Sequence, residues 1–384
     1  MLAVGLMSGT SLDGIDAALV SILPIGRGYA VELRHFQTIA FEPNLYQDLI
    51  GSLPPNTGSI AAAAQLHHAL GRAYAQAARD LIGQTSVGYV ASHGQTVWHD
   101  GTRHVTFQLG DAFAIRDAVN ATVCYDFRSA DCAAGGLGAP LVAHVDQLLL
   151  GDEREDRAAL NLGGIANVTL LRRGRPAEAV AAFDTGPANM LLDAFVSERT
   201  GGERSLDVNG ALAAAGCPNA ELLAAMLTDA YFAALPPKTT GREYFGAHFL
   251  QRYHRTLERM SLEDGAATLT ELTAASVARA IARAGFSAAR VIVSGGGAHN
   301  PTMLARIAAR LGHDRVETSD RVGMPVDAKE AMAFAVLGYE TLRERVGNVP
   351  AATGARHPVV LGAIAPSDLR TLLAAIEREC RVCS

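Results

Sequence analysis

The chain opens twice in the same way. Apolar segments predict three strands with no helix between them at residues 2–7, 15–23 and 29–41, and again at residues 157–162, 165–171 and 179–183. Strands that follow one another without a crossover helix pair antiparallel. In each copy a turn of small residues joins the first two strands, Ser8 to Gly14 in the first and Gly163-Gly164 in the second. The repeat therefore predicts two similar α/β halves that divide near residue 130.

The size and charge of the chain are those of a globular protein. Its 384 residues suffice for two domains, and 49% of them are hydrophobic while 19% are charged. The net charge of −6 excludes the basic surface that nucleic-acid binding requires. Apolar runs are too short to span a bilayer, and the first residues lack the basic region of a secretory signal. We therefore expect a cytoplasmic protein with no nucleic-acid and no membrane partner.

The cysteines carry little information. There are five of them, an odd and sparse set that makes no disulfide framework. Cys380 and Cys383 have C-x-x-C spacing, but a zinc site needs about four ligands and no second pair follows. We expect no metal or redox role for them.

The first turn combines glycines, hydroxyls and carboxylates in a pattern suited to phosphate. Gly9 and Gly14 let the backbone approach a ligand closely. The hydroxyls between them add donors beside the backbone N–H groups, and such a concavity suits phosphate oxygens. Asp13 and Asp16 place carboxylates where a hydrated Mg²⁺ on a nucleotide would bind. From these residues alone, a tight hairpin turn whose hydroxyls bond their own backbone is an equal alternative.

Two more glycine-rich segments lie in the second half. NLGGIAN contains Gly163 and Gly164, and VSGGGAHNP follows a buried strand at residues 290–293. Small-residue turns from both halves can grip a polyphosphate from two sides, and the glycine triplet suits the close approach of an adenosine. The alternative is that these glycines simply end strands.

Eight segments together resemble one family. MSGTSLDGIDAALV, SHGQTVWH, QLGD, DFRSADCAAGGLGAPLV, NLGGIANVT, FDTGPANMLLDAF, PPKTTGREYF and VSGGGAHNP are similar to the motifs of the anhydro-N-acetylmuramic acid kinases, in the family's order, from residue 5 to about residue 338. These enzymes belong to the superfamily of actin, sugar kinases and chaperone ATPases. The resemblance implies two similar actin-like (ribonuclease H-like) α/β domains, residues 1–130 and 131–384, with a nucleotide cleft between them. The last helix could pack back on the first domain.

The resemblance also implies a reaction. Such an enzyme takes 1,6-anhydro-N-acetylmuramic acid, ATP and water, opens the anhydro bridge by hydrolysis and phosphorylates the freed O6. The products are N-acetylmuramic acid 6-phosphate and ADP, in peptidoglycan recycling. ATP and Mg²⁺ are the implied cofactors, and the family suggests a homodimer.

Phosphate and metal contacts are assigned by matching the family's ATP segments. The matching residues are Gly9, Thr10, Ser11, Leu12, Asp13, Gly14, Ile15, Asp16, Asn161, Gly163, Gly164, Gly295, Gly296, Gly297 and Asn300. Asp13 and Asp16 are the metal candidates, directly or through water.

Two acidic residues are the catalytic candidates. Asp184 is predicted at the end of the strand at residues 179–183, and it matches the family's base, which takes the proton from the attacking water. The alternative is that Asp184 caps a helix that begins at Pro187. Glu330, at the start of the last long helix, is a second acid near the metal or the water, or an exposed helix-start residue.

The sugar needs a cation for its lactyl carboxylate. Arg128 is the candidate for bidentate recognition. The other substrate candidates are His93, Gln95, Thr96, Gln108, Asp111 and Asp131, of which the first three are expected at the end of a short strand at residues 88–92. Each of these six could instead be structural. Residues 129–138 depart from the family's pattern, which leaves their contacts with the sugar open. Lys238 and Arg242 could touch a ligand or rim the cleft.

Two other functions stay open from the sequence. Another sugar kinase of the superfamily would use the same ATP site with a different acceptor. A non-enzymatic actin-like nucleotide switch is less favoured, because the chain lacks obvious polymer-forming insertions and keeps the sugar-side motifs.

Overall fold

The computed structural model of the protein describes residues 1–9, 12, 14–25, 28–53, 58–174, 180–241 and 244–382. They form two compact units. The first contains Met1–Leu149 and Ala328–Ser384, and the second contains Leu150–Asp327. The first unit thus extends past the predicted boundary at residue 130 and also takes up the C-terminal segment.

The later boundary has a physical cause in the segment that follows residue 130. Asp131 lies in α4 (Ser129–Ala133), and its carboxylate accepts hydrogen bonds from Asn348 Nδ2 and Thr353 Oγ1, both at 2.7 Å. These bonds tie the segment to the C-terminal part of the first unit. The sheet of the second unit starts only at Arg157.

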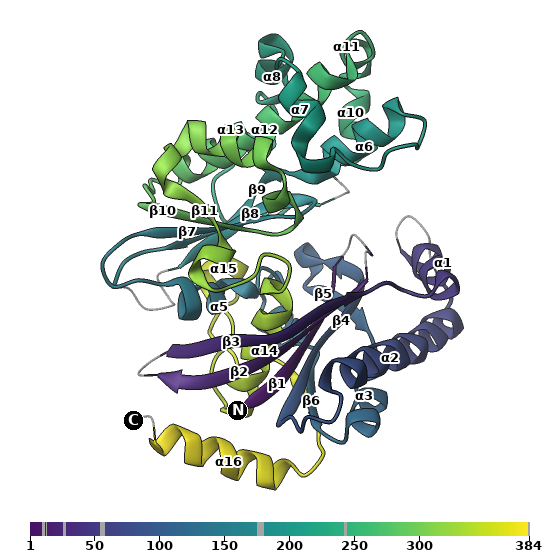
Figure 1. Cartoon of the computed structure of the whole chain (residues 1–384), viewed down its shortest axis with the longest axis vertical. Helices are drawn as coiled ribbons and strands as arrows, with labels where there is room; N and C mark the ends of the chain where they lie inside the picture. Colours follow the sequence, from purple (N-terminus) through teal and green to yellow (C-terminus); the bar gives the residue numbers. More distant parts are fainter. Residues whose placement is uncertain are drawn as a thin grey trace. The chain divides into compact units, whose positions relative to one another are not determined.

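The first unit is built on one sheet (Figure 1). Its strands are β1 (Leu2–Ser8), β2 (Ile15–Ile25), β3 (Gly28–Ile39), β4 (Tyr89–Asp100), β5 (Val105–Leu109), β6 (Thr122–Tyr125) and β12 (Ala363–Ala365). They lie in the order β12-β6-β4-β1-β2-β3, with β5 paired to β4 off this path. β1, β2 and β3 are antiparallel neighbours, whereas β4 is parallel to β1 and β6 is parallel to β4.

Helices cover both faces of this sheet. They are α1 (Pro43–Ser52), α2 (Ile60–Ile82), η1 (Gly101–Arg103), α3 (Ala112–Val119), α4, α5 (Val142–Leu150), α14 (Lys329–Leu342), α15 (Pro350–Thr353) and α16 (Leu369–Val382). Alternate residues of a strand face opposite sides. Val4 and Leu6 of β1 pack in one apolar cluster with Leu70 of α2. Gly5 faces α14, so closely that a Cβ there would lie 1.8 Å from the carbonyl oxygen of Ala331.

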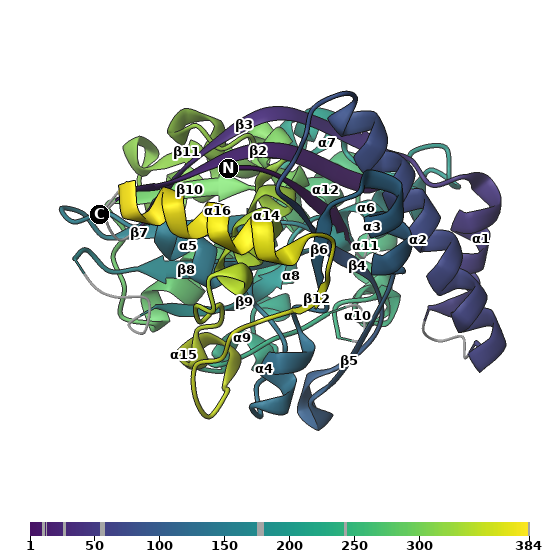
Figure 2. The ribbon, with the colours of Figure 1, turned by 90° about the horizontal axis from the view of Figure 1, so that it is seen from below.

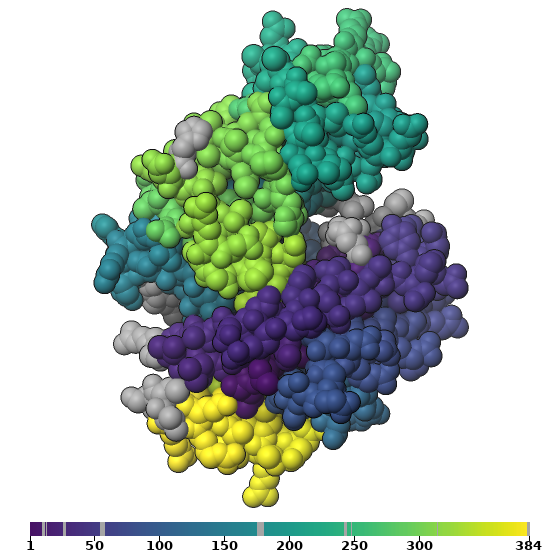
Figure 3. Space-filling model, viewed as in Figure 1, coloured from purple at the N-terminus to yellow at the C-terminus, as the bar shows by residue number. Residues whose placement is uncertain are grey.

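The C-terminal helix α16 belongs to the first unit. It runs beside β2 and the N-terminus (Figure 2), and it is exposed on the face shown in Figure 3 next to the N-terminal strands. The α-amino group of Met1 pairs with the carboxylate of Glu379 at 3.3 Å, and the Tyr339 hydroxyl donates to the same carboxylate. The two ends of the chain are therefore joined within one unit.

The second unit has its own sheet. Its strands are β7 (Arg157–Leu162), β8 (Ile165–Leu171), β9 (Ala181–Pro187), β10 (Arg290–Ser294) and β11 (Val316–Thr318). They lie in the order β11-β10-β7-β8-β9. The first three are antiparallel neighbours, and β10 and β11 run parallel to β7. This repeats the order and directions of β6-β4-β1-β2-β3 in the first unit.

The helices of the second unit follow β9 or flank β10. They are α6 (Asn189–Arg199), η3 (Val208–Gly210), α7 (Ala211–Ala215), α8 (Ala220–Met226), α9 (Ala230–Ala233), α10 (Ala247–Gln251), α11 (His254–Glu258), α12 (Leu262–Arg283), η4 (Gly296–His299), α13 (Pro301–Leu311), η5 (His313–Arg315) and η6 (Ser319–Val322). Buried side chains of α12, such as Leu269 and Val277, join the strands' apolar residues in a single core cluster.

Each unit thus carries the predicted fold. Three antiparallel strands followed by two parallel ones, in the spatial order 3-2-1-4-5, are the ribonuclease H-like arrangement of an actin-like domain. The prediction of two similar α/β domains is confirmed. Within the described part of the chain, no helix has the length and hydrophobicity needed to cross a membrane.

Candidate functional site

In the second unit, Asp184 is fixed by the segment that follows α9. It lies inside β9, opposite Asn167 of β8. Its carboxylate oxygen Oδ2 accepts hydrogen bonds from the Thr239 hydroxyl at 2.9 Å and from the Thr240 backbone N–H at 2.8 Å. Its own backbone N–H donates to the carbonyl of Lys238 at 3.1 Å. The FDTGP and PPKTTGREYF motifs therefore meet at this carboxylate.

The structure shows that Asp184 does not cap a helix. β9 extends to Pro187, and α6 begins at Asn189 with Ala188 as its N-cap, so the predicted start at Pro187 was two residues early. The backbone N–H groups at this helix start donate to the carbonyls of Gly163 and Gly164. The carboxylate of Asp184 instead binds the segment at Thr239 and Thr240.

Lys238 is a cation close to Asp184. Its ammonium group lies 4.4 Å from the centre of the Tyr231 ring and donates to the Tyr231 carbonyl at 3.1 Å. Burial, with Arg283 nearby, lowers the pKa of Lys238 to about 8, although Asp184 opposes the shift. Arg242, the other cation of the motif, lies outside the described residues.

The structure brings the two glycine segments of the second unit together. Ser294 at the end of β10 pairs with Asn161 near the end of β7, so NLGGIAN and SGGG leave the sheet at the same edge. A Cβ on Gly295 would lie 2.5 Å from Asn161 Oδ1, and one on Gly297 would lie 2.6 Å from Leu162 Cβ. A Cβ on Gly296 would meet nothing within 4 Å. Gly295 and Gly297 are thus packed against the turn after β7, whereas Gly296 is exposed at the carboxyl end of β10, where α/β folds place ligands.

Asn300 has a structural partner that the sequence prediction did not assign. Its side-chain oxygen accepts from Met303 N at 2.9 Å and caps α13, and the residue is 6% exposed. Asn300 was predicted to contact adenosine. The structure gives its oxygen the role of a helix cap.

In the first unit, the turn between β1 and β2 is only partly described. Thr10, Ser11 and Asp13 lie outside the described residues. Leu12 has a left-handed backbone, with φ of 63°, and Gly14 approaches the carbonyl of Ile39 so closely that a Cβ would lie 2.4 Å from its oxygen. The side chains of Leu12 and Ile15 are buried in the core, so only their backbone could contact a ligand. Asp16 is partly buried and accepts from the Thr38 hydroxyl at 2.6 Å.

The SHGQTVWH motif lies inside a strand and not at the end of one. β4 extends to Asp100, because β5 pairs with its second half. The expected short strand at residues 88–92 was therefore wrong in length. Gln95 is fully buried and bonds to Ser8 and Gly9. Thr96 is partly buried, and its hydroxyl accepts from Gln108 Nε2 at 3.1 Å.

Arg128 is bound by neutral acceptors. Its Nε donates to His93 Nε2 at 2.9 Å, and its Nη1 donates to the Gly138 carbonyl at 2.7 Å. Burial, with the Arg128 guanidinium beside it, holds the pKa of His93 well below its usual value. His93 is therefore neutral and accepts from Arg128. A partly buried guanidinium with two uncharged partners is a candidate anion-binding group.

Two predicted sugar ligands are occupied by internal partners. Asp131 is fully buried, and besides its bonds to the C-terminal segment it accepts from Gly138 N at 2.8 Å. Asp111 caps α3 by accepting from Phe113 N and Ala114 N. In the structure the first fixes a loop and the second a helix, and their contact with the sugar stays a prediction.

Glu330 lies in the first turn of α14 and is partly buried. Burial raises its pKa, while the charges of Lys329 and Arg128 oppose the shift. The neighbouring Lys329 forms a buried ion pair with Asp146, with Nζ to Oδ1 at 2.8 Å. Glu330 and Arg128 thus belong to one charged cluster, which lies next to His93.

A preformed metal cluster is not found in the described ranges. No three acidic, His or Cys side chains there come together in a geometry for a metal ion. Asp16 is the described member of the predicted metal pair. A carboxylate beside a phosphate-binding turn suits a Mg²⁺ ion that arrives on a nucleotide and keeps several waters.

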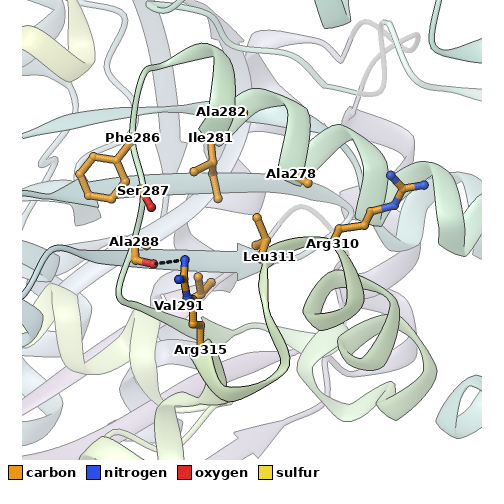
Figure 4. A pocket seen from close by; sticks show the side chains of 10 residues that line it. All are labelled: Ala278, Ile281, Ala282, Phe286, Ser287, Ala288, Val291, Arg310, Leu311 and Arg315. Atoms are coloured by element: carbon orange, nitrogen blue, oxygen red, sulfur yellow. Dashed lines mark hydrogen bonds between the residues drawn. The ribbon is translucent and has the colours of Figure 1, made fainter.

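One cavity in the second unit lies away from these residues. It has a volume of about 190 Å³ and lies between α12, α13 and the start of β10, with Phe286, Leu311 and Arg315 among its lining residues (Figure 4). It adjoins the amino-terminal end of β10, whereas the glycine triplet follows the carboxyl end. None of the predicted site residues lines it.

The family model and the sequence relatives agree on one family. A sequence model described as anhydro-N-acetylmuramic acid kinase matches residues 1–367. A relative of that name from Xanthomonas axonopodis pv. citri is 46% identical over 374 residues, which cover 95% of this chain and 98% of the relative. Another of that name, from Caldanaerobacter subterraneus subsp. tengcongensis, is 40% identical and covers 94% and 96%. Among solved structures, an activator of 2-hydroxyisocaproyl-CoA dehydratase from Clostridium difficile aligns with a TM-score of 0.44 and 14% identity over 91% of this chain and 99% of its own.

Proposed function

Because this chain belongs to the anhydro-N-acetylmuramic acid kinase family, we propose that it converts 1,6-anhydro-N-acetylmuramic acid, ATP and water into N-acetylmuramic acid 6-phosphate and ADP. This reaction returns a cell-wall sugar to metabolism. The observation that carries the proposal is the fixed carboxylate of Asp184, held by Thr239 and Thr240 from another motif.

Asp184 is the proposed general base. As the oxygen of water forms its bond to the anomeric carbon, the bond from that carbon to O6 breaks and a proton of the water passes to the carboxylate. O6 takes the γ-phosphoryl group, and the bond from that phosphorus to the β-phosphate oxygen breaks to release ADP. A base in this position contributes about 10²- to 10⁴-fold to the rate.

Arg128 is the proposed partner of the lactyl carboxylate. The neutral ring of His93 and the carbonyl of Gly138 fix two of its donors without neutralising its charge. These two bonds pair the guanidinium with no charge, but Glu330 and Asp131 act on it electrostatically, and an anionic substrate group would share it with them. Glu330, on the same cluster, is proposed to orient the substrate or the attacking water. Thr96 and Gln108 remain proposed sugar contacts.

Each unit is proposed to contact ATP through backbone. In the first unit the contacts come from the turn after β1 together with Asp16. In the second they come from Asn161, Gly163, Gly164 and the segment Gly295 to Gly297, of which Gly296 is exposed. When bound, Mg²⁺ would neutralise charge on the phosphates, and Asp16 would hold it directly or through water. By the family resemblance we also propose a homodimer, and the need for ATP favours a cytoplasmic location.

An isotope experiment tests the proposal. The enzyme is incubated with anhydro-N-acetylmuramic acid, ATP and ¹⁸O-water, and the products are analysed by mass spectrometry. We expect a 6-phosphate that carries the label at the anomeric carbon. If the protein phosphorylates ordinary N-acetylmuramic acid or N-acetylglucosamine and ignores the anhydro sugar, it is another sugar kinase. Nucleotide-dependent filaments without turnover would favour an actin-like switch.

A further inference from the structure

A buried chain of hydrogen bonds ends at the first carbonyl of the turn between β1 and β2. The Tyr74 hydroxyl of α2 bonds to Ser8 Oγ, and Ser8 Oγ donates to Gln95 Oε1 at 2.7 Å. Gln95 Nε2 in turn donates to the carbonyl of Gly9 at 3.3 Å. Tyr74, Ser8 and Gln95 are each at most 1% exposed. Residues of α2, β1 and β4 thus form one chain of hydrogen bonds, and its last member, Gln95, bonds to the Gly9 carbonyl of the turn.

A bulge in the sheet aims Gln95 at this turn. β4 pairs with β1 in register up to Leu6 and Ser92, but after that Ser8 lies opposite Gln95, so β4 carries one extra residue. The extra residue is accommodated at Gly94, whose φ is +71° and where a Cβ would lie 2.7 Å from the carbonyl oxygen of Leu109. A one-residue shift moves a side chain to the other face of a sheet. Bulges commonly re-aim a side chain in this way beside functional sites.

The turn itself needs such support. The Gly9 carbonyl also accepts from Leu12 N at 3.4 Å, which closes the turn. Leu12 is held in the left-handed region, which a leucine rarely adopts, and its side chain is buried in the core. A strained backbone persists only where its surroundings over-determine it. Gln95 supplies the polar part of that support and Leu12 the apolar part.

We propose that Gln95 is a positioning residue for ATP and not a ligand of the sugar, and that Tyr74 and Ser8 fix its amide. This inference rests on the proposed function, because it assigns the turn to the phosphates. The chain of donors runs from Tyr74 through Ser8 and Gln95 to the Gly9 carbonyl, and each bond in such a chain polarises the next. Without Gln95 the Gly9 peptide loses its buried partner and the turn is free to leave its ATP-binding conformation.

Three variants of the full-length enzyme test the inference. Gln95→Met removes the bonds of the amide to Ser8, to the Gly9 carbonyl and to the Thr96 carbonyl, and Tyr74→Phe removes only the bond between Tyr74 and Ser8. Gln37→Met is the matched control, because Gln37 Nε2 donates to the Ala77 carbonyl of the same helix, α2, and not to the Gly9 peptide. Dissociation constants for ATP are measured by calorimetry without sugar, and Michaelis constants are measured for both substrates.

We expect Gln95→Met to weaken ATP binding by about tenfold, the size of one lost buried hydrogen bond. Tyr74→Phe should weaken it by a few-fold, and Gln37→Met should leave it unchanged. The Michaelis constant for the sugar should stay within about twofold in all three, since a bond of this kind acts on one ligand. If Gln95→Met does not fold, the few-fold increase in the ATP dissociation constant expected for Tyr74→Phe is the deciding measurement.

The opposite pattern overturns the inference. ATP affinity at the wild-type level in both variants, with a raised Michaelis constant for the sugar, would place Gln95 in the sugar site. Failure of the proposed function is a separate result, because it appears as absence of turnover in the wild-type enzyme. The calorimetric comparison of ATP affinity needs no turnover and so decides on Gln95 in either case.

Discussion

Replacement of Asp184 by asparagine separates chemistry from structure at the candidate base. Both described donors to its carboxylate, the Thr239 hydroxyl and the Thr240 N–H, bond to the same oxygen, Oδ2. The amide oxygen of asparagine can accept both of these bonds, so the local structure should be retained. An amide cannot accept the proton of the attacking water. We expect turnover to fall by about 10²- to 10⁴-fold, which corresponds to about 2.7–5.4 kcal/mol of transition-state stabilisation.

A second aspartate of the same unit provides the matched control. In Asp207 the two carboxylate oxygens accept one backbone N–H each, from Leu212 at 2.8 Å and from Ala213 at 3.0 Å. Asparagine can satisfy only one of these, so Asp207→Asn should cost about 1–3 kcal/mol of stability. Its turnover at a permissive temperature should stay near the wild-type rate. Asp184→Asn is thus expected to lower the rate without lowering stability, and Asp207→Asn is expected to lower stability without lowering the rate.

Three measurements follow for each enzyme: release of ADP in a coupled assay, ATP affinity by calorimetry and the free energy of unfolding in urea. Asp184→Asn should bind ATP like the wild type and unfold at the same denaturant concentration. A rate above one tenth of the wild-type rate would refute the assignment of Asp184 as the base. Loss of stability similar to that of Asp207→Asn would show that its carboxylate is structural.

Three further predictions concern stability. Gly5→Ala should lower the free energy of unfolding by about 1–3 kcal/mol, measured in urea, because the new Cβ would meet the backbone of α14 at Ala331. Asn300→Ala should cost about 1 kcal/mol through loss of the α13 cap, and Asn300→Asp should retain the melting temperature because its oxygen still accepts from Met303. Burial depresses the pKa of His93 in the folded state. Below about pH 6.5 the unfolded chain therefore binds a proton at His93 that the folded chain does not bind. The free energy of unfolding should then fall as the pH falls, by up to about 1.4 kcal/mol per pH unit. His93→Gln, which keeps an acceptor for Arg128, should flatten this slope in unfolding curves recorded between pH 5 and pH 7; an unchanged slope would exclude His93 as its source.

The duplicated fold could be predicted because its signals are local. Strand alternation, small-residue turns and the absence of helices between the first three strands of each half are visible within short windows. The match of FDTGP to a family also made Asp184 the predicted base. Thr239 and Thr240 were present in the PPKTTGREYF motif, but only the folded chain brings them to Asp184.

What the sequence did not indicate are hydrogen-bond partners that lie far away in the chain. Asp131 bonds to Asn348 and Thr353, more than two hundred residues later, and nothing near Asp131 indicates this. Gln95 faces the first turn because of a bulge that depends on pairing with both β1 and β5. Asn300 is different, since an asparagine followed by proline at a helix start is a local capping signal.

The connection of the two units has a consequence for biosynthesis. The second unit, Leu150–Asp327, is continuous in the chain, whereas the first is interrupted by it. The ribosome therefore synthesises every residue of the second unit before it makes α14. This helix covers one face of the first unit's sheet. Domains usually fold from the N-terminus onward as they emerge. Until α14 has been made, the N-terminal strands stay uncovered at Gly5 and its neighbours, and the amino group of Met1 gains its partner Glu379 only after that.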